Sequence, residues 1–301
     1  MSKRWVAIQR NPRSGSGQRR ALLLELISRL REHGLRPRIF SRRERLQEYL
    51  TNPDSRASLV GIVAAGGDGT AGDVINRYPG IPVAVLPLGT ENLLARFLGI
   101  KRSGRFVADM IAAGQTRHID LGVADDRRFS LMASCGFDAD ILQRTHARRT
   151  GHITKMSYLQ PILISLRKYK YPEMRVYLDG ADAPISCRVA VITNLPIYGF
   201  GLNFARSARA DDGRLDVCLF QRHSAFQMFR YLYKVARGKH EQLSDVVCAQ
   251  AQHVRIESDQ PVPAQIDGDP AGETPIDIGI EPGACELFVP SDELTRSKGA
   301  R

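Results

Sequence analysis

Hydrophobic residues in the first 120 positions follow two alternating patterns. Short apolar runs, typical of buried strands, lie at residues 5–8, 36–40, 63–65 and 82–86. Between them, apolar residues recur every three or four positions and predict helices at residues 18–33, 44–50 and 103–113. Gly34 and Gly114 stand where two of these helices should end. Strands that alternate with helices predict an α/β domain with three layers and a mainly parallel sheet.

The pattern changes after residue 122. Strand-like runs then follow one another across short turns, at residues 129–135, 174–178, 186–193, 215–220, 246–256 and 261–266. Two helical stretches interrupt them, at residues 157–169 and 225–237. This spacing predicts a second domain at residues 123–285, a mainly antiparallel β-sandwich. A last strand is expected at residues 285–289.

A glycine-rich turn follows the apolar run at residues 63–65. It consists of Gly66, Gly67, Asp68, Gly69 and Thr70. Glycines permit positive φ and let backbone N–H groups approach an anion at a helix N-terminus. Asp68 then stands where a cation bound to a phosphate would lie. The turn matches neither G-x-x-x-x-G-K-[ST] nor G-x-G-x-x-G, so an ordinary βα loop without a ligand remains an alternative.

A second turn of this kind, at residues 87–92, follows the strand at 82–86. It reads Pro-Leu-Gly-Thr-Glu-Asn and leads into a helix. In doubly wound sheets, ligands bind at the carboxyl ends of the strands. The two turns can therefore face one crevice.

The order of these motifs resembles the diacylglycerol kinase catalytic-domain family, which includes bacterial soluble lipid kinases and the sphingosine kinases. The resemblance rests on GGDGT at 66–70 and PLGT-x-N-x-x-AR at 87–96, and on matching segments at 11–17, 136–139, 211–216 and 267–269. It implies an NAD-kinase/phosphofructokinase-like first domain at residues 1–122, completed by residues 286–301. Three residues depart from the family pattern: Glu91 replaces a Gly, Asp73 a Glu or Asn, and Asp269 a Glu.

The resemblance implies that the first domain binds ATP together with Mg²⁺. The implied nucleotide contacts are Asn11, Pro12, Ser14, Gly15, Ser41, Gly66, Gly67, Asp68, Gly69, Thr70, Gly72, Asp73, Gly89, Thr90 and Asn92, with Asp68 also helping to hold the metal. Without the resemblance, residues 11–17 would be interpreted as an ordinary βα connection, and Ser41 equally well as a helix cap.

Phosphoryl transfer also needs a group that accepts the proton of the attacked hydroxyl. The family places its catalytic base in an Asp-Gly-acid segment, which matches Asp267-Gly268-Asp269 here. The resemblance indicates Asp269 as the base and Asp267 as its partner, but an aspartate reaches less far than a glutamate, so the two roles could be exchanged. An Asp-Gly hairpin turn is the purely structural alternative.

The segment at residues 211–216 offers further carboxylates around a tight turn. In relatives, the matching loop binds a structural Mg²⁺. The resemblance implies Asp212 as the side-chain ligand, with backbone carbonyls of Arg209 and Arg214. An ordinary type I turn is the alternative.

Net charge, cysteine spacing and hydrophobic run length indicate which partners and which compartment to expect. A net charge of +11 over 301 residues favours an anionic partner, and without a nucleic-acid motif we expect no nucleic acid. The five cysteines are dispersed and predict buried, reduced thiols. No apolar run approaches the ~18 residues of a spanning helix, so a cytoplasmic protein is expected.

Two basic stretches place cations beside aromatic residues, at 144–149 with Lys155 and at 167–171. Such a mixture suits an anionic membrane surface, with tyrosines at the interface, although most charge runs are solvated faces. We expect peripheral association with a membrane that holds the lipid substrate. The protein could also form a homodimer.

Taken with the resemblance, the sequence predicts an ATP-dependent, Mg²⁺-requiring lipid kinase. Its substrate would be a hydroxyl of a diacylglycerol-like or sphingoid-like lipid. Two alternatives stay open: an NAD kinase-like enzyme, and a non-catalytic regulator that binds a nucleotide or a lipid.

Overall fold

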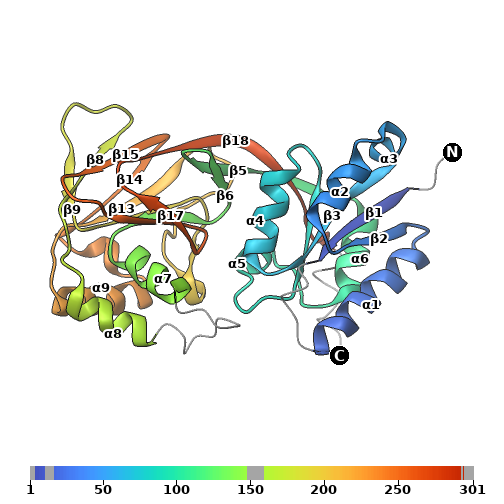
Figure 1. Cartoon of the computed structure of the whole chain (residues 1–301), viewed down its shortest axis with the longest axis horizontal. Helices are drawn as coiled ribbons and strands as arrows, with labels where there is room; N and C mark the ends of the chain where they lie inside the picture. Colours follow the sequence, from blue (N-terminus) through green and yellow to red (C-terminus); the bar gives the residue numbers. More distant parts are fainter. Residues whose placement is uncertain (1–3, 11–16, 148–158, 293, 295–301) are drawn as a thin grey trace. The chain divides into compact units, whose positions relative to one another are not determined.

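The computed structural model describes residues 4–10, 17–147, 159–292 and 294. The chain divides into two compact units (Figure 1). Unit 1 comprises Met1–Ile119 and Ala284–Arg301, and unit 2 comprises Asp120–Gly283. The predicted nucleotide contacts Asn11, Pro12, Ser14 and Gly15 lie outside the described residues.

Unit 1 is built on a parallel sheet with the strand order β2-β1-β3-β4-β18. The strands are β1 (Trp5–Arg10), β2 (Arg36–Phe40), β3 (Leu59–Gly66), β4 (Val83–Pro87) and the end of β18 (Ile276–Phe288). Strands β3 and β4 are almost continuously apolar because the sheet buries them on both faces. The carboxyl ends of β1, β3 and β4 therefore meet at one edge, where the glycine turns begin.

Helices cover both faces of this sheet (Figure 1). They are α1 (Gly17–Glu32) and α6 (Gly104–Ala113) on one face, and α2 (Arg43–Leu50), α3 (Pro53–Ala57) and α4 (Asp68–Arg77) on the other; the short α5 (Leu93–Phe97) follows β4. Helix α6 can pack closely on α1 because a Cβ at Gly104 would lie 2.0 Å from the Leu22 carbonyl oxygen. Ser103 caps the start of α6, and Gly114 ends it with φ of 71°.

Unit 2 is a sandwich of two mainly antiparallel sheets. One sheet has the order β14-β13-β10-β7-β16-β17. Its strands are β7 (Met132–Cys135), β10 (Val189–Thr193), β13 (Leu215–Phe220), β14 (Val246–Ala251), β16 (Pro263–Ile266) and β17 (Asp269–Glu273). The other sheet contains β5 (Thr116–Ala124), β6 (Arg127–Phe129), β8 (Met174–Leu178), β9 (Ile185–Cys187), β15 (His253–Ser258) and the first part of β18.

Apolar side chains of these two sheets form one buried core, which includes Phe129, Ile192, Leu215, Val254 and Ile278. Three helices belong to unit 2: α7 (Phe137–Ala147), α8 (Leu159–Lys168) and α9 (Ala225–Ala236). A small hairpin pairs β11 (Ile197–Tyr198) with β12 (Leu202–Asn203). The fold predicted from the sequence, an α/β domain followed by a β-sandwich, is confirmed.

Several predicted strands are wrong in extent. The runs at 129–135, 186–193 and 246–256 each form two strands, β6 and β7, β9 and β10, and β14 and β15, because a turn or a bend divides each run. The strand expected at 285–289 is the end of the thirteen-residue β18. The sequence pattern did not predict helix α7; only the motif at residues 136–139, where the helix begins, was noted. Apolar continuity alone does not reveal these breaks.

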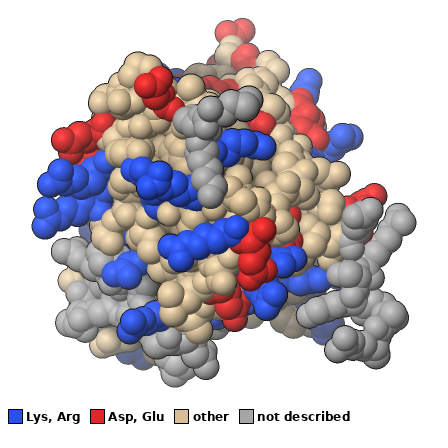
Figure 2. Space-filling model, turned by 90° about the vertical axis from the view of Figure 1, so that its right-hand side faces the viewer, with Lys and Arg blue, Asp and Glu red and all other residues tan. Residues whose placement is uncertain are grey.

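Of the five cysteines, Cys248 is exposed, so the prediction of buried thiols is wrong there. It lies on β14, a strand at the edge of its sheet whose residues alternate between buried and exposed. Among the described helices, none is long and apolar enough to cross a membrane. On the face shown in Figure 2, basic side chains are scattered among acidic ones and form no single patch.

Candidate active site

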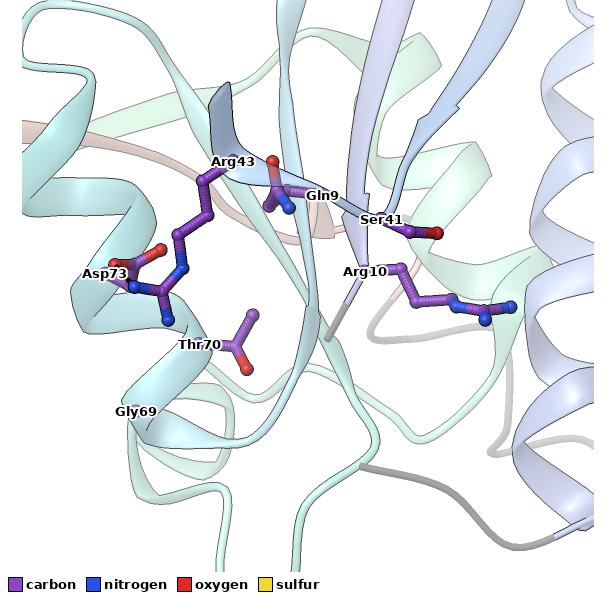
Figure 3. Close-up of a pocket in the computed structure, with 7 residues that line it drawn as sticks. All are labelled: Gln9, Arg10, Ser41, Arg43, Gly69, Thr70 and Asp73. Atoms are coloured by element: carbon purple, nitrogen blue, oxygen red, sulfur yellow. Dashed lines mark ion pairs between the residues drawn. The ribbon is translucent and has the colours of Figure 1, made fainter. Parts of the chain in front are cut away.

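A pocket in unit 1 opens at the carboxyl ends of β1 and β2 and at the start of α4 (Figure 3). It is lined by Gln9, Arg10, Ser41, Arg43, Gly69, Thr70 and Asp73. Strand β1 lies between β2 and β3, and the helices that follow β1 and β2 leave to opposite faces of the sheet. Ligands of open α/β sheets bind at such a switch point. Four predicted nucleotide contacts, Ser41, Gly69, Thr70 and Asp73, thus line one pocket.

Gln9 and Arg10 were not predicted as site residues. Gln9 is buried, and its amide nitrogen donates to the Phe40 carbonyl at 3.3 Å. Its Oε1 has no hydrogen-bond partner among the described residues. A buried acceptor without a partner is costly, so a ligand donor such as a hydroxyl or an amine would satisfy it. Their place at the end of the first strand is the signal that could have identified both residues.

Arg43 is a third residue that sequence reasoning missed. Its guanidinium lies 3.2 Å from Asp73 across the pocket wall (Figure 3), and Asp73 also pairs with Arg77 at 3.3 Å. The Arg43 side chain is 53% exposed, so the Asp73 pair leaves much of the cation open to solvent. Arg10 and Arg43 give the pocket the positive charge that a polyphosphate requires.

The two glycine turns of unit 1 pack directly against each other. The Leu88 amide donates to the Gly66 carbonyl at 2.8 Å. A Cβ at Gly89 would lie 2.5 Å from the Gly67 Cα, and one at Gly67 would lie 3.2 Å from the Gly89 Cα. A larger residue at Gly89 would force the backbone of the first turn to move, and one at Gly67 would require a shift of a few tenths of an ångström. The close pair of turns needs glycine for this contact, and not for positive φ.

Asp68 and Asn92 hold the second turn in shape. The Asp68 carboxylate accepts the Leu94 amide at 3.1 Å, at the start of α5. Burial raises the pKa of Asp68, and its hydrogen bonds with the amides of Leu93 and Leu94 oppose that shift. Asn92, with φ of 50°, uses its side-chain amide twice on Gly89: Oδ1 accepts the Gly89 N–H at 2.8 Å and Nδ2 donates to its carbonyl at 2.9 Å.

The pocket suits a nucleotide. A Cβ at Gly69 or Gly72 would meet no atom within 4 Å, so the start of α4 has open space beside it. The first N–H groups of a helix have no partner within the helix and can bind an anion. The described residues contain no group of three or more His, Cys, Asp or Glu side chains placed to hold a metal ion. The metal roles of Asp68, Asp212 and the carbonyls of Arg209 and Arg214 stay predictions.

In unit 2, the acidic turn joins β16 to β17. Ile266 pairs with Asp269, so Asp267 and Gly268 are the central residues of the hairpin, with φ of 49° and 87°. Positive φ at both positions is the geometry of a type I′ turn, which Asp-Gly favours. The structural alternative therefore describes the backbone of this segment well. Its two carboxylates nevertheless differ in their surroundings.

The Asp267 carboxylate is bound on both oxygens. Oδ1 accepts the amides of Leu131 and Met132, each at 2.9 Å. Oδ2 accepts the Ser130 amide at 2.9 Å and its hydroxyl at 3.2 Å. A carboxylate that accepts several backbone amides is stabilised in its charged form. Asp267 thus fastens the hairpin to the start of β7.

Asp269 is the exposed acid of this turn, with a side chain 54% exposed. Its Oδ1 lies 3.9 Å from Nε2 of His146, beyond hydrogen-bond distance. The same imidazole nitrogen lies 3.1 Å from the carbonyl oxygen of Gly268. His146, on α7, thus contacts the turn at Gly268. No motif in the sequence predicts this contact.

A buried polar network also supports the turn. The Gly268 amide donates to Gln265 Oε1 at 2.9 Å, and Gln265 Nε2 donates to Ser134 Oγ at 2.7 Å. The Ser134 hydroxyl in turn donates to Asp138, which also accepts the Tyr198 hydroxyl at 3.0 Å. Burial raises the pKa of Asp138 although both hydroxyls favour its charged form. The motif at 136–139 therefore reaches the acidic turn through side chains.

The loop at 211–216 is anchored by a residue that the sequence did not suggest. Asp120 is buried; its Oδ2 accepts the Gly213 amide and its Oδ1 the Gly283 amide, both at 2.7 Å. The Asp212 carboxylate accepts the Arg214 amide at 3.1 Å, as in an ordinary polar turn. Arg209 pairs with Asp211 at 3.6 Å.

The two basic stretches were expected to present cations and tyrosines to a membrane surface, and the structure agrees only in part. Arg144 is bound to Asp140 through two hydrogen bonds of 2.7 and 2.9 Å. Tyr171 is buried and stacks on Phe137 with ring centroids 5.6 Å apart, so it does not face an interface. Arg167, Lys168 and Lys170 are exposed, and residues 148–149 and Lys155 lie outside the described residues.

Comparison with protein families explains why these elements occur together. The model of the diacylglycerol kinase catalytic domain matches residues 6–124. The model of the YegS C-terminal NAD kinase beta sandwich-like domain matches residues 131–289, more than half of the chain. The chain belongs to the diacylglycerol kinase family. The resemblance seen in the sequence motifs is confirmed. Membership of this family supports a lipid kinase.

Members of the diacylglycerol kinase family resemble the chain over most of its length. A diacylglycerol kinase of Mycobacterium tuberculosis is 29% identical over 238 residues, which are 76% of each chain. A diacylglycerol kinase of Staphylococcus carnosus is 23% identical over 289 residues, 94% of each chain. The crystal structure of a diacylglycerol kinase from Bacillus anthracis has 20% identity and a TM-score of 0.73, covering 95% of this chain and 97% of that one, and it supports the fold.

Proposed function

We propose that this protein transfers the γ-phosphoryl group of ATP to a hydroxyl of a diacylglycerol-like or sphingoid-like lipid. Asp269 is the proton acceptor in this proposal. The observation that supports it is the different surroundings of the two carboxylates in the acidic turn, in a chain that belongs to the diacylglycerol kinase family. Asp267 is committed to backbone amides, whereas Asp269 is exposed on a hairpin that His146 contacts at Gly268.

The pocket of unit 1 supports the nucleotide part of the proposal. The start of α4 offers amides to the phosphates, and Arg10 and Arg43 add positive charge. The unpartnered Gln9 Oε1 supplies an acceptor for a donor of the ribose or the base. Asp68 and Asn92 act indirectly here, because Asp68 binds the Leu94 amide after the second turn and Asn92 holds Gly89 within it. Mg²⁺ would neutralise charge on the phosphate oxygens.

The acidic turn supports the chemical step. In that step, the lipid hydroxyl oxygen forms a bond to the γ-phosphorus, and the bond from that phosphorus to the β–γ bridging oxygen breaks. The hydroxyl proton passes to the Asp269 carboxylate, and ADP leaves. A positioned general base contributes roughly 10² to 10⁴ in rate. Because Asp267 is locked by four hydrogen bonds, the structure favours Asp269 over Asp267 for this role.

The test is incubation of the purified protein with γ-labelled ATP and Mg²⁺, separately with diacylglycerol, sphingosine and NAD. We expect label in one of the two lipids and none in NAD. Asp269→Asn should remove labelling while the thermal unfolding midpoint stays unchanged.

Label in NAD alone would contradict the lipid-kinase proposal. Full labelling of lipid by Asp269→Asn would leave the kinase intact and remove Asp269 as its base. Parallel reactions with Mg²⁺ replaced by EDTA test the metal requirement, and undiminished labelling in EDTA would contradict it.

A further inference from the structure

Helix α9 of unit 2 exposes an unusual amount of apolar surface. Four of its side chains, Phe226, Phe229, Leu232 and Tyr233, are 74, 57, 47 and 57% exposed. They are four of the seven large hydrophobic side chains that the described residues expose. We call these four residues the aromatic face of α9. An exposed apolar surface of this kind marks an interaction site.

The fold does not require this face. Helix α9 turns a different stripe, Met228, Tyr231 and Val235, towards the core of unit 2. A surface helix normally has one apolar stripe and a polar opposite side. In α9, steps of three and four residues through Phe226, Phe229 and Tyr233 create a second apolar stripe on another side of the helix.

Other contacts already hold α9 in place. The Ser224 hydroxyl accepts the Gln227 amide at 3.1 Å and caps the helix. The Tyr231 hydroxyl donates to the buried Asp245 at 2.8 Å, and Arg230 binds the same carboxylate at 2.7 and 3.1 Å. The aromatic face can therefore be changed without loss of these anchors.

The segment that carries the aromatic face is rich in cations. Residues 222–239 contain five cations, Arg222, Arg230, Lys234, Arg237 and Lys239, and no Asp or Glu. Asp245 lies close to Arg222 and Arg230. Among the described residues, Lys234 and Lys239 have no ion-pair partner, and Arg237 covers the Tyr233 ring at 5.3 Å from its centroid.

We propose that α9 docks this protein on an anionic lipid bilayer. The aromatic face would enter the boundary between headgroups and acyl chains, and Lys234, Arg237 and Lys239 would contact anionic headgroups. Aromatic and aliphatic residues bordered by Lys and Arg are the composition of helices that lie in a membrane interface. The proposal rests on the proposed function, since a kinase whose lipid substrate stays in a bilayer has to work at its surface.

Charge favours a bilayer over a second copy of the chain. A symmetric contact between two aromatic faces would bring the cations of both helices together, without an acid on either α9 to pair with them. The neighbouring α8, which contacts α9 (Figure 1), extends the same chemistry: Leu163 is 53% exposed, and Arg167 and Lys168 are exposed.

The test is cosedimentation of the full-length protein with vesicles of phosphatidylcholine containing phosphatidylglycerol. Phe226→Ser with Phe229→Ser should weaken binding at least tenfold. Lys234→Gln with Lys239→Gln should weaken it by about fivefold per cation and should flatten its salt dependence. The matched control, Leu24→Ser with Ile39→Ser, removes side chains 55 and 46% exposed on unit 1 and should bind like the wild type.

A kinase assay separates this proposal from the proposed function. With diacylglycerol in vesicles, the Phe226/Phe229 variant should lose activity in proportion to its binding, while a short-chain diacylglycerol dispersed as monomers should be phosphorylated at the wild-type rate. If the wild type phosphorylates no lipid, the vesicle experiment still decides the role of α9.

Wild-type vesicle binding by the Phe226/Phe229 variant would overturn the proposal. An equal loss in the Leu24/Ile39 control would overturn it too. A third contradicting result is a wild-type dimer, measured by light scattering, that this variant dissociates without change in vesicle binding. That result would make the face a contact between copies.

Discussion

Two turns of this protein place an aspartate beside glycine, one in each unit, and each aspartate does structural work. In unit 1, Asp68 accepts the Leu94 amide and so fixes the second glycine turn. In unit 2, Asp267 accepts three amides and a hydroxyl of residues 130–132. The residues that follow the two aspartates differ. The first turn leads into the start of α4, whereas the second presents a further, exposed carboxylate, Asp269.

The comparison shows that two aspartates of glycine turns, Asp68 and Asp267, bind backbone amides, and under the proposed function the base is a different acid, Asp269. A carboxylate saturated by amides is held in place, and the neighbour that it positions keeps its lone pairs available. In the proposed function, the turn of unit 1 would present its N–H groups to phosphate, and the acidic turn of unit 2 would present Asp269 as the base.

The largest effect should come from Asp269. Asp269→Asn removes the proposed base, whose Oδ1 lies 3.9 Å from His146 Nε2, beyond hydrogen-bond distance, so turnover should fall by about 10² to 10⁴. The unfolding midpoint in urea should stay at the wild-type value. Lipid phosphorylation and urea unfolding measure the two quantities. A variant that retains a tenth of wild-type turnover would show that the exposed acid is not the base.

A change at Asp267 should lower stability as well as turnover, unlike a change at Asp269. Asp267→Ala leaves three amides and a hydroxyl without their acceptor, so the free energy of unfolding should fall by roughly 2–4 kcal/mol. Turnover should fall as well, because the hairpin that holds Asp269 loses its anchor. If urea unfolding shows a change below 0.5 kcal/mol (about the size of a surface substitution), the structural role given to Asp267 is wrong.

Gly89 tests the glycine turns of unit 1. In Gly89→Ala, the Cβ would lie 2.5 Å from the Gly67 Cα and 2.7 Å from Asn92 Oδ1, so the turns must separate. We expect ATP affinity to fall about tenfold or more, equivalent to about 1.4 kcal/mol, as measured by calorimetry with a non-hydrolysable analogue. Gly199→Ala is the control, since a Cβ there meets no atom within 4 Å. Equal affinities in wild type and Gly89→Ala would remove these turns from the nucleotide site.

Asp68 should give the smallest effect, and one that depends on pH. Burial raises its pKa in the folded protein, so between its ordinary value near 4 and the raised value the folded state binds more protons than the unfolded one. The stability contribution of Asp68 therefore declines as the pH rises through this window. Asp68→Asn keeps an oxygen for the Leu94 amide and abolishes this decline. Its free energy of unfolding relative to wild type should thus rise between pH 4 and pH 7.

Urea unfolding at the two pH values measures this difference. A constant difference between Asp68→Asn and wild type would show that the ionised carboxylate is compensated by its amides. Asp68 would then resemble Asp267 in energy as well as in hydrogen bonding.

What the sequence determined by itself was local. Apolar periodicity defined the parallel strands of unit 1 and most strands of unit 2, because burial on one or both faces of a sheet leaves a regular pattern. The glycine turns and the Asp-Gly hairpin were also predictable, since each needs particular residues at neighbouring positions. The motif order was sufficient to identify the family.

Only the tertiary structure decided which side chains act and which support. Gln9 and Arg43 join the pocket through strand order, and His146 reaches Gly268 across 122 positions of sequence. Asp267 and Asp269 look alike in the sequence, but the amides of residues 130–132 bind the first and the second is exposed. The reason is physical: hydrogen bonding and burial depend on neighbours in space, and spacing along the chain does not record them.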